Sequence, residues 1–184
     1  MARRDCGCDD DYFDRSRRRN AVAKPGATMD PSESLYKTTI MRHYRSLEFR
    51  RVIVGFDLES QQVNRSCGDR IKLQFKLDKN GLISDAAYQG EGCSICIASA
   101  AMLCAAVRGK TVNESAGLAS DLIAMLDLPD DQEARAYFNL IENRVGEPEA
   151  DILSLWSVRS YGARIPCALL SWNILPQLLE KPAS

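Results

Sequence analysis

The clearest pattern in the chain is an alternation of apolar and polar residues between positions 71 and 77. A period of two predicts a strand with one buried face and one wet face; here the apolar positions are Ile71, Leu73, Phe75 and Leu77, and the polar ones are Lys72, Gln74 and Lys76. Asn80-Gly81 follows and accepts the positive φ angles of a tight hairpin turn. Residues 82–89 are therefore expected to return antiparallel. Short β-rich runs at 51–56 and 61–66 suggest further strands.

Apolar residues recur every three to four positions on both sides of this hairpin, which predicts helices. One helix should begin near Ser32, and others should cover 93–107, 113–126 and 131–143, with an apolar segment at 152–158. A last helix should start near Pro166, and Pro176 should end or kink it. The predicted fold class is α+β: a small antiparallel sheet of about three strands covered by helices.

The composition divides the chain at about residue 30. The first 20 residues hold six Arg and five Asp with almost no apolar residue, so they cannot bury enough surface to offset the entropy of ordering. We expect a disordered arm over 1–30 and a single domain over 31–184. The whole chain has 184 residues, 45% of them hydrophobic, and is large enough to bury a core without disulfides.

Charge and cysteine content exclude several classes of protein. The net charge of −1 and the pI near 5.9 argue against nucleic acid as the main partner. The uncharged run 93–107 is too short to span a membrane, and no signal peptide is visible, so we expect a cytoplasmic protein. Reducing cytoplasm does not sustain a disulfide framework, and seven is an odd number of cysteines. Metal binding or thiol chemistry is the better expectation.

Four residues have the chemistry of a metal and sulfur site. Cys93 and Cys167 fall at predicted helix starts, where the helix dipole should lower the pKa of a thiol. Cys67 precedes Gly68, which permits a tight turn, and Asp69 can point the same way as Cys67 in extended backbone. Three thiolates and one carboxylate suit Zn²⁺ or iron held with sulfide. The alternative is a set of buried cysteines beside a surface aspartate.

Other cysteines and the only histidine are weaker candidates. Cys93-Ser-Ile-Cys96 matches the C-x-x-C pattern of a redox dithiol, but the antiparallel hairpin before it is not the βαβ context of thioredoxin. Cys104 is too far along the same helix to share a metal, so we expect a core residue. Cys6 and Cys8 are either a labile pair or incidental thiols. His43 is expected to pack or hydrogen-bond.

The chain resembles the SufU/IscU (NifU N-terminal-like) family of iron–sulfur cluster assembly proteins from about Leu35 to Leu179. The resemblance rests on several blocks in the same order: LYKTTIMRHYRS, CGDRIKLQFKL, GEGCSICIASAAML, VRGKT and SLWSVRSYGARIPCALLSWNIL. The SufU branch is closer, because 74 positions separate Cys93 from Cys167 (167 − 93) and because Pro166 stands where IscU-like proteins carry a histidine.

The SufU resemblance implies a zinc site formed by Cys67, Asp69, Cys93 and Cys167. It also implies that Cys67 accepts persulfide sulfur from a SufS-type cysteine desulfurase, with Arg164 in support, for delivery to downstream cluster assembly proteins or apo-acceptors. The chain departs from the family pattern at several positions, among them Arg42, Arg65-Ser66, Cys96 and Pro166, but it keeps every ligand. Cys96, one turn from Cys93, could compete for the metal or capture a persulfide.

Two alternatives remain beside the sulfur acceptor. The first is a non-enzymatic scaffold that holds a transient [2Fe–2S] cluster on the same ligands. The second is a structural zinc adaptor, in which the metal serves only folding.

Overall fold

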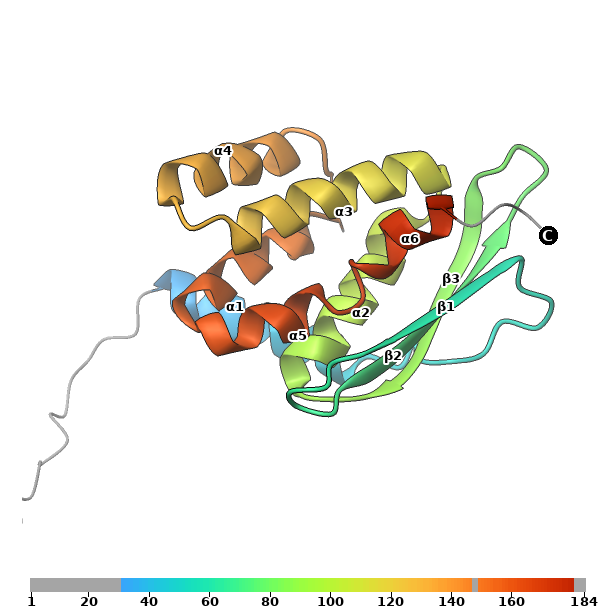
Figure 1. The fold of residues 1–184 in the computed structure, drawn as a ribbon, viewed down its shortest axis with the longest axis horizontal. Coiled ribbons are helices and arrows are strands. Elements are labelled where there is room, and N and C mark those ends of the chain that lie inside the picture. Colours follow the sequence, from blue (N-terminus) through green and yellow to red (C-terminus); the bar gives the residue numbers. More distant parts are fainter. Residues whose placement is uncertain (1–30, 147–148, 181–184) are drawn as a thin grey trace, which may run out of the picture.

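The computed structural model describes residues 31–146 and 149–180, so the arm predicted for 1–30 lies outside the described residues. The elements, in chain order, are α1 (Pro31–Arg45), β1 (Leu58–Val63), β2 (Arg70–Leu77), β3 (Ile83–Glu91), α2 (Ser94–Val107), α3 (Val112–Asp127), α4 (Asp131–Glu142), the 3₁₀ helices η1 (Glu149–Ser160) and η2 (Gly162–Arg164), α5 (Ile165–Leu169) and α6 (Ile174–Glu180). The α+β prediction is confirmed (Figure 1). The single-domain boundary at residue 31 stays a prediction.

The sheet is antiparallel, with strand order β1-β2-β3. Leu73 lies opposite Tyr88 and Phe75 opposite Ala86, and these four side chains are buried on the face that the helices cover. The hairpin turn is where it was predicted, but only Gly81, with φ of 78°, has the expected positive φ, and Asn80 does not. The alternation at 71–77 therefore predicted the strand and its buried apolar face.

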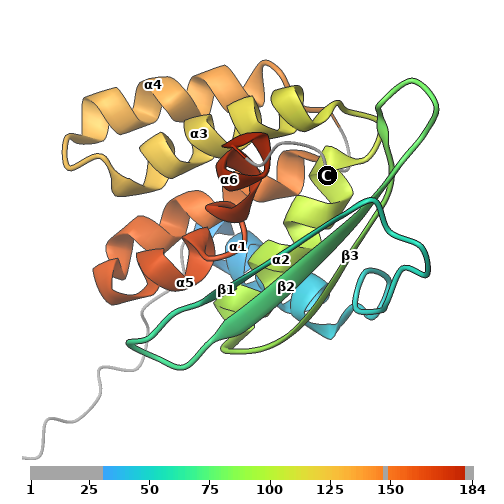
Figure 2. The same cartoon turned by 45° about the vertical axis from the view of Figure 1, so that its right-hand side comes forward.

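Helix α2 lies between the sheet and the other helices (Figure 2). Eleven of its side chains are buried, so it is apolar nearly all round rather than along one stripe. A helix enclosed on all sides is fixed in position by its neighbours. This matters for function because the helix begins directly after Cys93.

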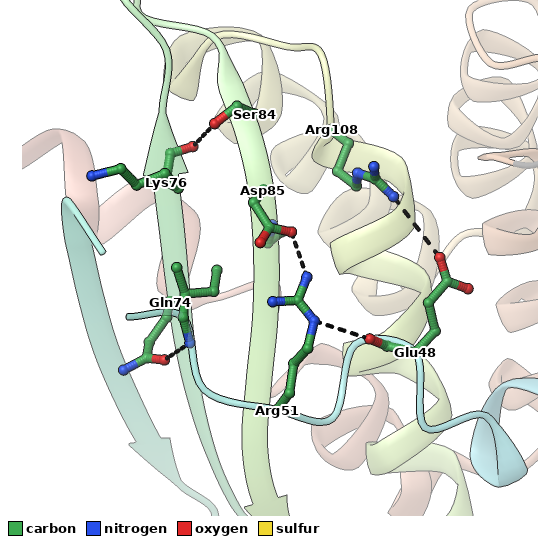
Figure 3. A network of polar contacts seen from close by, with 9 residues as sticks. Glu48, Arg51, Gln74, Lys76, Ser84, Asp85 and Arg108 are labelled. Atoms are coloured by element: carbon green, nitrogen blue, oxygen red, sulfur yellow. Dashed lines mark hydrogen bonds and ion pairs between the residues drawn. The ribbon is translucent and has the colours of Figure 1, made fainter. Parts of the chain in front are cut away.

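The strand predicted at 51–56 is wrong. This segment crosses the sheet as a loop, held by side chains instead of a strand ladder (Figure 3). The backbone N–H of Ile53 donates to Gln74 Oε1 at 3.0 Å, and Arg51 donates to Asp85 Oδ1 at 2.6 Å and to the Glu48 carbonyl at 3.2 Å. Ile53 is buried, whereas Val54 is 95% exposed. The strand suggested at 61–66 exists but is displaced, because β1 covers 58–63.

After α2, the chain between Cys93 and Cys167 continues as α3, α4 and η1, and Arg159 joins these three. Its guanidinium donates to the carbonyls of Met125, Leu126 and Leu128 at 2.9–3.2 Å, which satisfies the C-terminal end of α3. It also pairs with Asp131 at 2.6 Å, in the first turn of α4. Helices α3 and α4 are therefore tied to the chain that leads to Cys167.

The last predicted helix is two helices, and Pro176 does not end one. It lies in the first turn of α6, where its missing N–H costs nothing. Turns at 170–173 separate α5 from α6. No helix in the described part of the chain is both long enough and apolar enough to cross a membrane.

Gly90 permits the close pairing of β2 and β3. A Cβ there would lie 2.2 Å from the Arg70 carbonyl oxygen and 2.7 Å from Ile71 Cδ1. We expect Gly90→Ala to lower the free energy of unfolding by about 1–3 kcal/mol, as overpacking does. Chemical denaturation checks this.

Gly117→Ala is the control: it has open space in α3, and it should be neutral or stabilising by about 0.5–1 kcal/mol. Equal effects of the two substitutions would contradict the steric argument.

The Arg51–Asp85 pair should make stability depend on acid pH. The hydrogen bond from Arg51 holds the pKa of Asp85 below its ordinary value. Because the folded pKa is the lower one, the stabilisation is complete above the ordinary pKa of about 3.9 and is lost as the pH falls through the folded pKa. The pair is partly exposed, at 43% and 32%, so we expect Asp85→Asn to cost at most about 1 kcal/mol at pH 7.

Urea unfolding of the parent and of Asp85→Asn between pH 2 and pH 7 measures this. The difference in free energy of unfolding between the parent and Asp85→Asn should fall to near zero at the acid end of this range. Asp127→Asn, at an exposed position that ends α3, is the control. A difference that stays constant with pH would contradict the assignment.

Candidate metal centre

Cys67 and Asp69 lie on a tight loop, residues 64–69, between β1 and β2. Two backbone hydrogen bonds of 2.8 Å close the loop, from Asn64 N to the Asp69 carbonyl and from Gly68 N to the Asn64 carbonyl. Gly68 has φ of 80°, which a side chain would disfavour, so the turn predicted from this glycine is confirmed. The loop places both candidate ligands directly before the first residue of β2, next to α2 and α5.

Cys93 and Cys167 come from two different helices. Cys93 is the N-cap of α2, with extended backbone and no side-chain capping bond. Cys167 is the third residue of α5, after Pro166 in the first turn. Buried Ser99 of α2 donates to the carbonyl of Ala168 at 2.6 Å, and this bond fixes α5 against α2. Both helix-start positions expected from the sequence are thus present.

The structure brings Cys67, Asp69 and Cys167 together, with one ligand atom of each within 4.8 Å of the others. The sulfur atoms of Cys67 and Cys167 are 3.7 Å apart. Cys93 adjoins this group, because its backbone N–H donates to Asp69 Oδ1 at 3.2 Å and its thiol also interacts with the carboxylate. Three of the four residues predicted from the sequence therefore lie together and Cys93 adjoins them; their ligation of a metal stays a prediction.

Asp69 is the centre of the group and has an unpaired oxygen. The side chain is buried, at 4% exposure, and its Oδ2 has no hydrogen-bond partner among the described residues. Burial raises the pKa of Asp69, but contacts with Cys67, Cys167 and the Cys93 N–H outweigh this, so the pKa lies below its ordinary value. A buried, ionised and half-paired carboxylate is costly unless a cation is near. This donor set fits a metal ion.

Gly92 allows the close approach of the helix start to Asp69. A Cβ at position 92 would lie 3.0 Å from Asp69 Cγ and 3.1 Å from Oδ1. The Gly-x-Gly sequence before Cys93 therefore has two separate steric functions, since Gly90 serves the strand pairing and Gly92 the carboxylate.

The expected lowering of the Cys167 pKa is wrong. Burial raises the pKa of this thiol, and its closeness to Asp69 and Cys67 raises it further. The dipole of the five-residue α5 does not offset confinement beside an anionic carboxylate. Cys67, in contrast, is exposed. The site thus has a buried sulfur and an accessible sulfur in contact.

The remaining sequence candidates lie in distinct environments. Cys96 is 1% exposed, and burial, then Asp69 and Cys93, raise its pKa, so its thiol is protonated and poorly accessible to a metal or persulfide. Cys104 is a buried core residue, as expected. His43 Nε2 lies 2.7 Å from Asp151 Oδ2 and ties α1 to η1, also as expected. Arg164 is exposed at the end of η2, and its supporting function stays a prediction.

One residue of the site was missed from the sequence. Asn64 bonds the loop of Cys67 and also approaches Cys167, with 3.9 Å between Asn64 Nδ2 and the sulfur. The only signal for Asn64 in the sequence was that asparagine favours turns and stands three positions before Cys67.

The family model of the NifU-like N-terminal domain matches residues 35–138. The chain belongs to this family. The match includes Cys67, Asp69 and Cys93 but ends before Cys167. This confirms the resemblance, drawn from the sequence motifs, to the SufU/IscU (NifU N-terminal-like) family of iron–sulfur cluster assembly proteins.

Individual relatives extend the similarity over most of the chain. The zinc-dependent sulfurtransferase SufU of Bacillus subtilis (strain 168) is 33% identical over 149 residues, which cover 81% of this chain and 92% of the relative. The iron–sulfur cluster assembly scaffold protein IscU of Streptococcus pyogenes serotype M1 is 32% identical, covering 82% and 86%. A crystal structure of FiSufU from Fervidobacterium islandicum AW-1, titled as a scaffold protein for the SUF system, superposes with a TM-score of 0.66 at 27% identity, covering 80% and 98%.

Proposed function

We propose that this protein is a zinc-bound sulfur acceptor that takes persulfide sulfur from a SufS-type cysteine desulfurase on Cys67. One observation carries the proposal: the exposed sulfur of Cys67 lies 3.7 Å from the buried sulfur of Cys167, beside a buried carboxylate with an unpaired oxygen. A purely structural metal site is normally enclosed by its ligands. Here one ligand can be reached by another protein.

Cys67, Asp69, Cys93 and Cys167 would hold the zinc ion. The ion would keep the cysteine sulfurs ionised at neutral pH and would offset the negative charge gathered around Asp69. The unpaired Asp69 Oδ2 is the oxygen available for this, since Oδ1 already accepts from Cys93 N–H. Three sulfurs and one oxygen make the four-coordinate donor set that zinc prefers.

The transfer step needs only a nucleophilic sulfur on this chain. The thiolate of Cys67 would attack the outer sulfur of the persulfide on the desulfurase cysteine. That S–S bond breaks, the desulfurase cysteine leaves as a thiolate, and Cys67 carries the new persulfide. No electrons are lost from the pair of proteins, because one thiolate replaces another. The exposed position of Cys67 and the exposed Arg164 suit contact with a partner.

The similarity to a relative named zinc-dependent sulfurtransferase supports this proposal. Downstream cluster assembly proteins or apo-acceptors would then take the sulfur, in the cytoplasm. No nucleic acid or membrane partner is proposed, in keeping with the balanced charge of the chain.

A second candidate is a scaffold on which a [2Fe–2S] cluster is assembled and handed on. It is favoured by the relatives named IscU scaffold proteins and by the mixed sulfur and oxygen donors, since one oxygen ligand would ease release of a cluster. The same four residues would hold this cargo. The two candidates therefore differ in what the site contains rather than in which residues form it.

Replacement of Cys67 should remove the stimulation of the desulfurase. We expect Cys67→Ala to leave turnover of cysteine by the desulfurase at the rate measured without this protein, because the accepting sulfur is gone. Sulfide and alanine production measure the effect. Ser66→Ala is the matched control, exposed in the same loop and bonded to Asn64 only through its backbone N–H. Full stimulation by Cys67→Ala would remove the central claim.

Metal content separates the two candidates. For a sulfur acceptor we expect about one zinc per chain, by elemental analysis, in protein purified with or without air, and loss of that zinc in Asp69→Ala because the carboxylate ligand is absent. Iron matched by acid-labile sulfide in the anaerobic preparation, with little zinc, would instead identify the scaffold. Absence of both metals would contradict both proposals.

A further inference from the structure

We propose that Asn64 is a positioning residue of the metal centre, whose side-chain amide holds the buried Cys167 sulfur in place while its other polar groups build the loop of Cys67. The inference rests on the proposed function for the presence of a metal. It adds a residue outside the four candidate ligands.

Every polar group of Asn64 has a partner in or near the site. Its backbone N–H donates to the carbonyl of Asp69, and its carbonyl accepts from the N–H of Gly68, each at 2.8 Å. Its side-chain Oδ1 accepts from Ser66 N–H at 3.0 Å, which forms an Asx-type turn. Its Nδ2 points to Cys167 Sγ at 3.9 Å. One half-buried side chain thus joins the loop to α5.

The bond from Ser66 N–H also determines which end of the Asn64 amide faces the sulfur. Because Ser66 N–H needs an acceptor, the oxygen of the amide turns toward the loop, and the NH₂ group is left for Cys167. An N–H directed at a thiolate stabilises its negative charge and restricts its orientation. Groups of this kind next to a ligand often contribute as much to metal affinity as to structure.

Asn64 also connects the site to the rigid sheet. It follows Val63, the last residue of β1, whose partner in β2 is Arg70, directly after Asp69. The loop is therefore anchored by strand pairing at both ends. Cys167 belongs to α5, held separately by Ser99. The amide of Asn64 joins the loop to α5, as does the contact between the sulfurs of Cys67 and Cys167.

Asn64→Asp separates positioning of the sulfur from folding of the loop. The substitution keeps both backbone bonds and an oxygen for Ser66 N–H, so the loop should remain. It replaces the amide NH₂ by a second carboxylate oxygen, which cannot donate and which repels a thiolate. Asn64→Ala removes the turn acceptor as well. Asn113→Asp, exposed on α3, adds the same charge elsewhere and is the control.

The experiment titrates Co²⁺ into the metal-stripped full chain of the parent and the variants and then displaces it with Zn²⁺. We expect Asn64→Asp to weaken Co²⁺ and Zn²⁺ binding by about 10- to 100-fold, the usual cost of losing a partner of a ligand, and to shift the sulfur-to-cobalt charge-transfer absorption. Thermal unfolding of the metal-stripped Asn64→Asp protein should match the parent. Asn113→Asp should match the parent in all measurements.

Two results would overturn the inference while the proposed function stands. One is parental affinity and absorption in Asn64→Asp. The other is weaker binding accompanied by an equally lowered unfolding temperature of the metal-stripped protein, which would make Asn64 a loop residue only. A parent that binds neither Co²⁺ nor Zn²⁺ would remove the proposed metal site, and this inference with it.

Discussion

The arrangement of the site depends on a buried hydrogen-bond relay centred on Ser99. The Ser99 hydroxyl donates to the carbonyl of Ala168 at 2.6 Å and accepts from Trp172 Nε1 at 2.9 Å, and all three residues are buried. Buried polar groups are costly when unpaired, so this relay specifies one register between α2 and the segment that contains α5. Cys93 precedes α2 and Cys167 lies next to Ala168. The relay therefore fixes two of the candidate ligands relative to each other.

The local parts of the fold could be predicted from the sequence because their signals are local. The alternation at 71–77, the Asn80-Gly81 turn and the helix periods each depend on neighbouring residues. The loop at 51–56 was misread for the opposite reason. Its β-rich composition suggested a strand, but Gln74 and Asp85 hold it in place from distant positions. No local pattern reveals that the acceptor of a backbone N–H is a side chain about 20 residues away.

The candidate ligands could be named from the sequence, but their environments could not. Glycines next to Cys67, Asp69 and Cys93, and predicted helix starts at Cys93 and Cys167, picked out the four residues, and the family resemblance implied the same set. The pKa direction of Cys167 depends on burial beside Asp69, a contact between segments about 100 positions apart. Asn64 was missed for a similar reason, since its amide meets Cys167 only in the folded chain. The position of Cys167 at a helix start was therefore not enough to predict the direction of its pKa shift.

Cys67 is exposed and Cys167 is buried, so the two cysteines of the site differ in how easily another molecule can reach them. A sulfur enclosed by α2, α5 and the sheet can serve as a lasting ligand, because displacing it would require the helices to separate. A sulfur on a turn that Gly68 shapes can leave the group while the rest keeps its geometry. Under the proposed function, exchange of sulfur would begin at Cys67, while Asp69, Cys93 and Cys167 would stay in place. The same arrangement suits a sulfur acceptor and a scaffold. It is therefore compatible with relatives that carry either name.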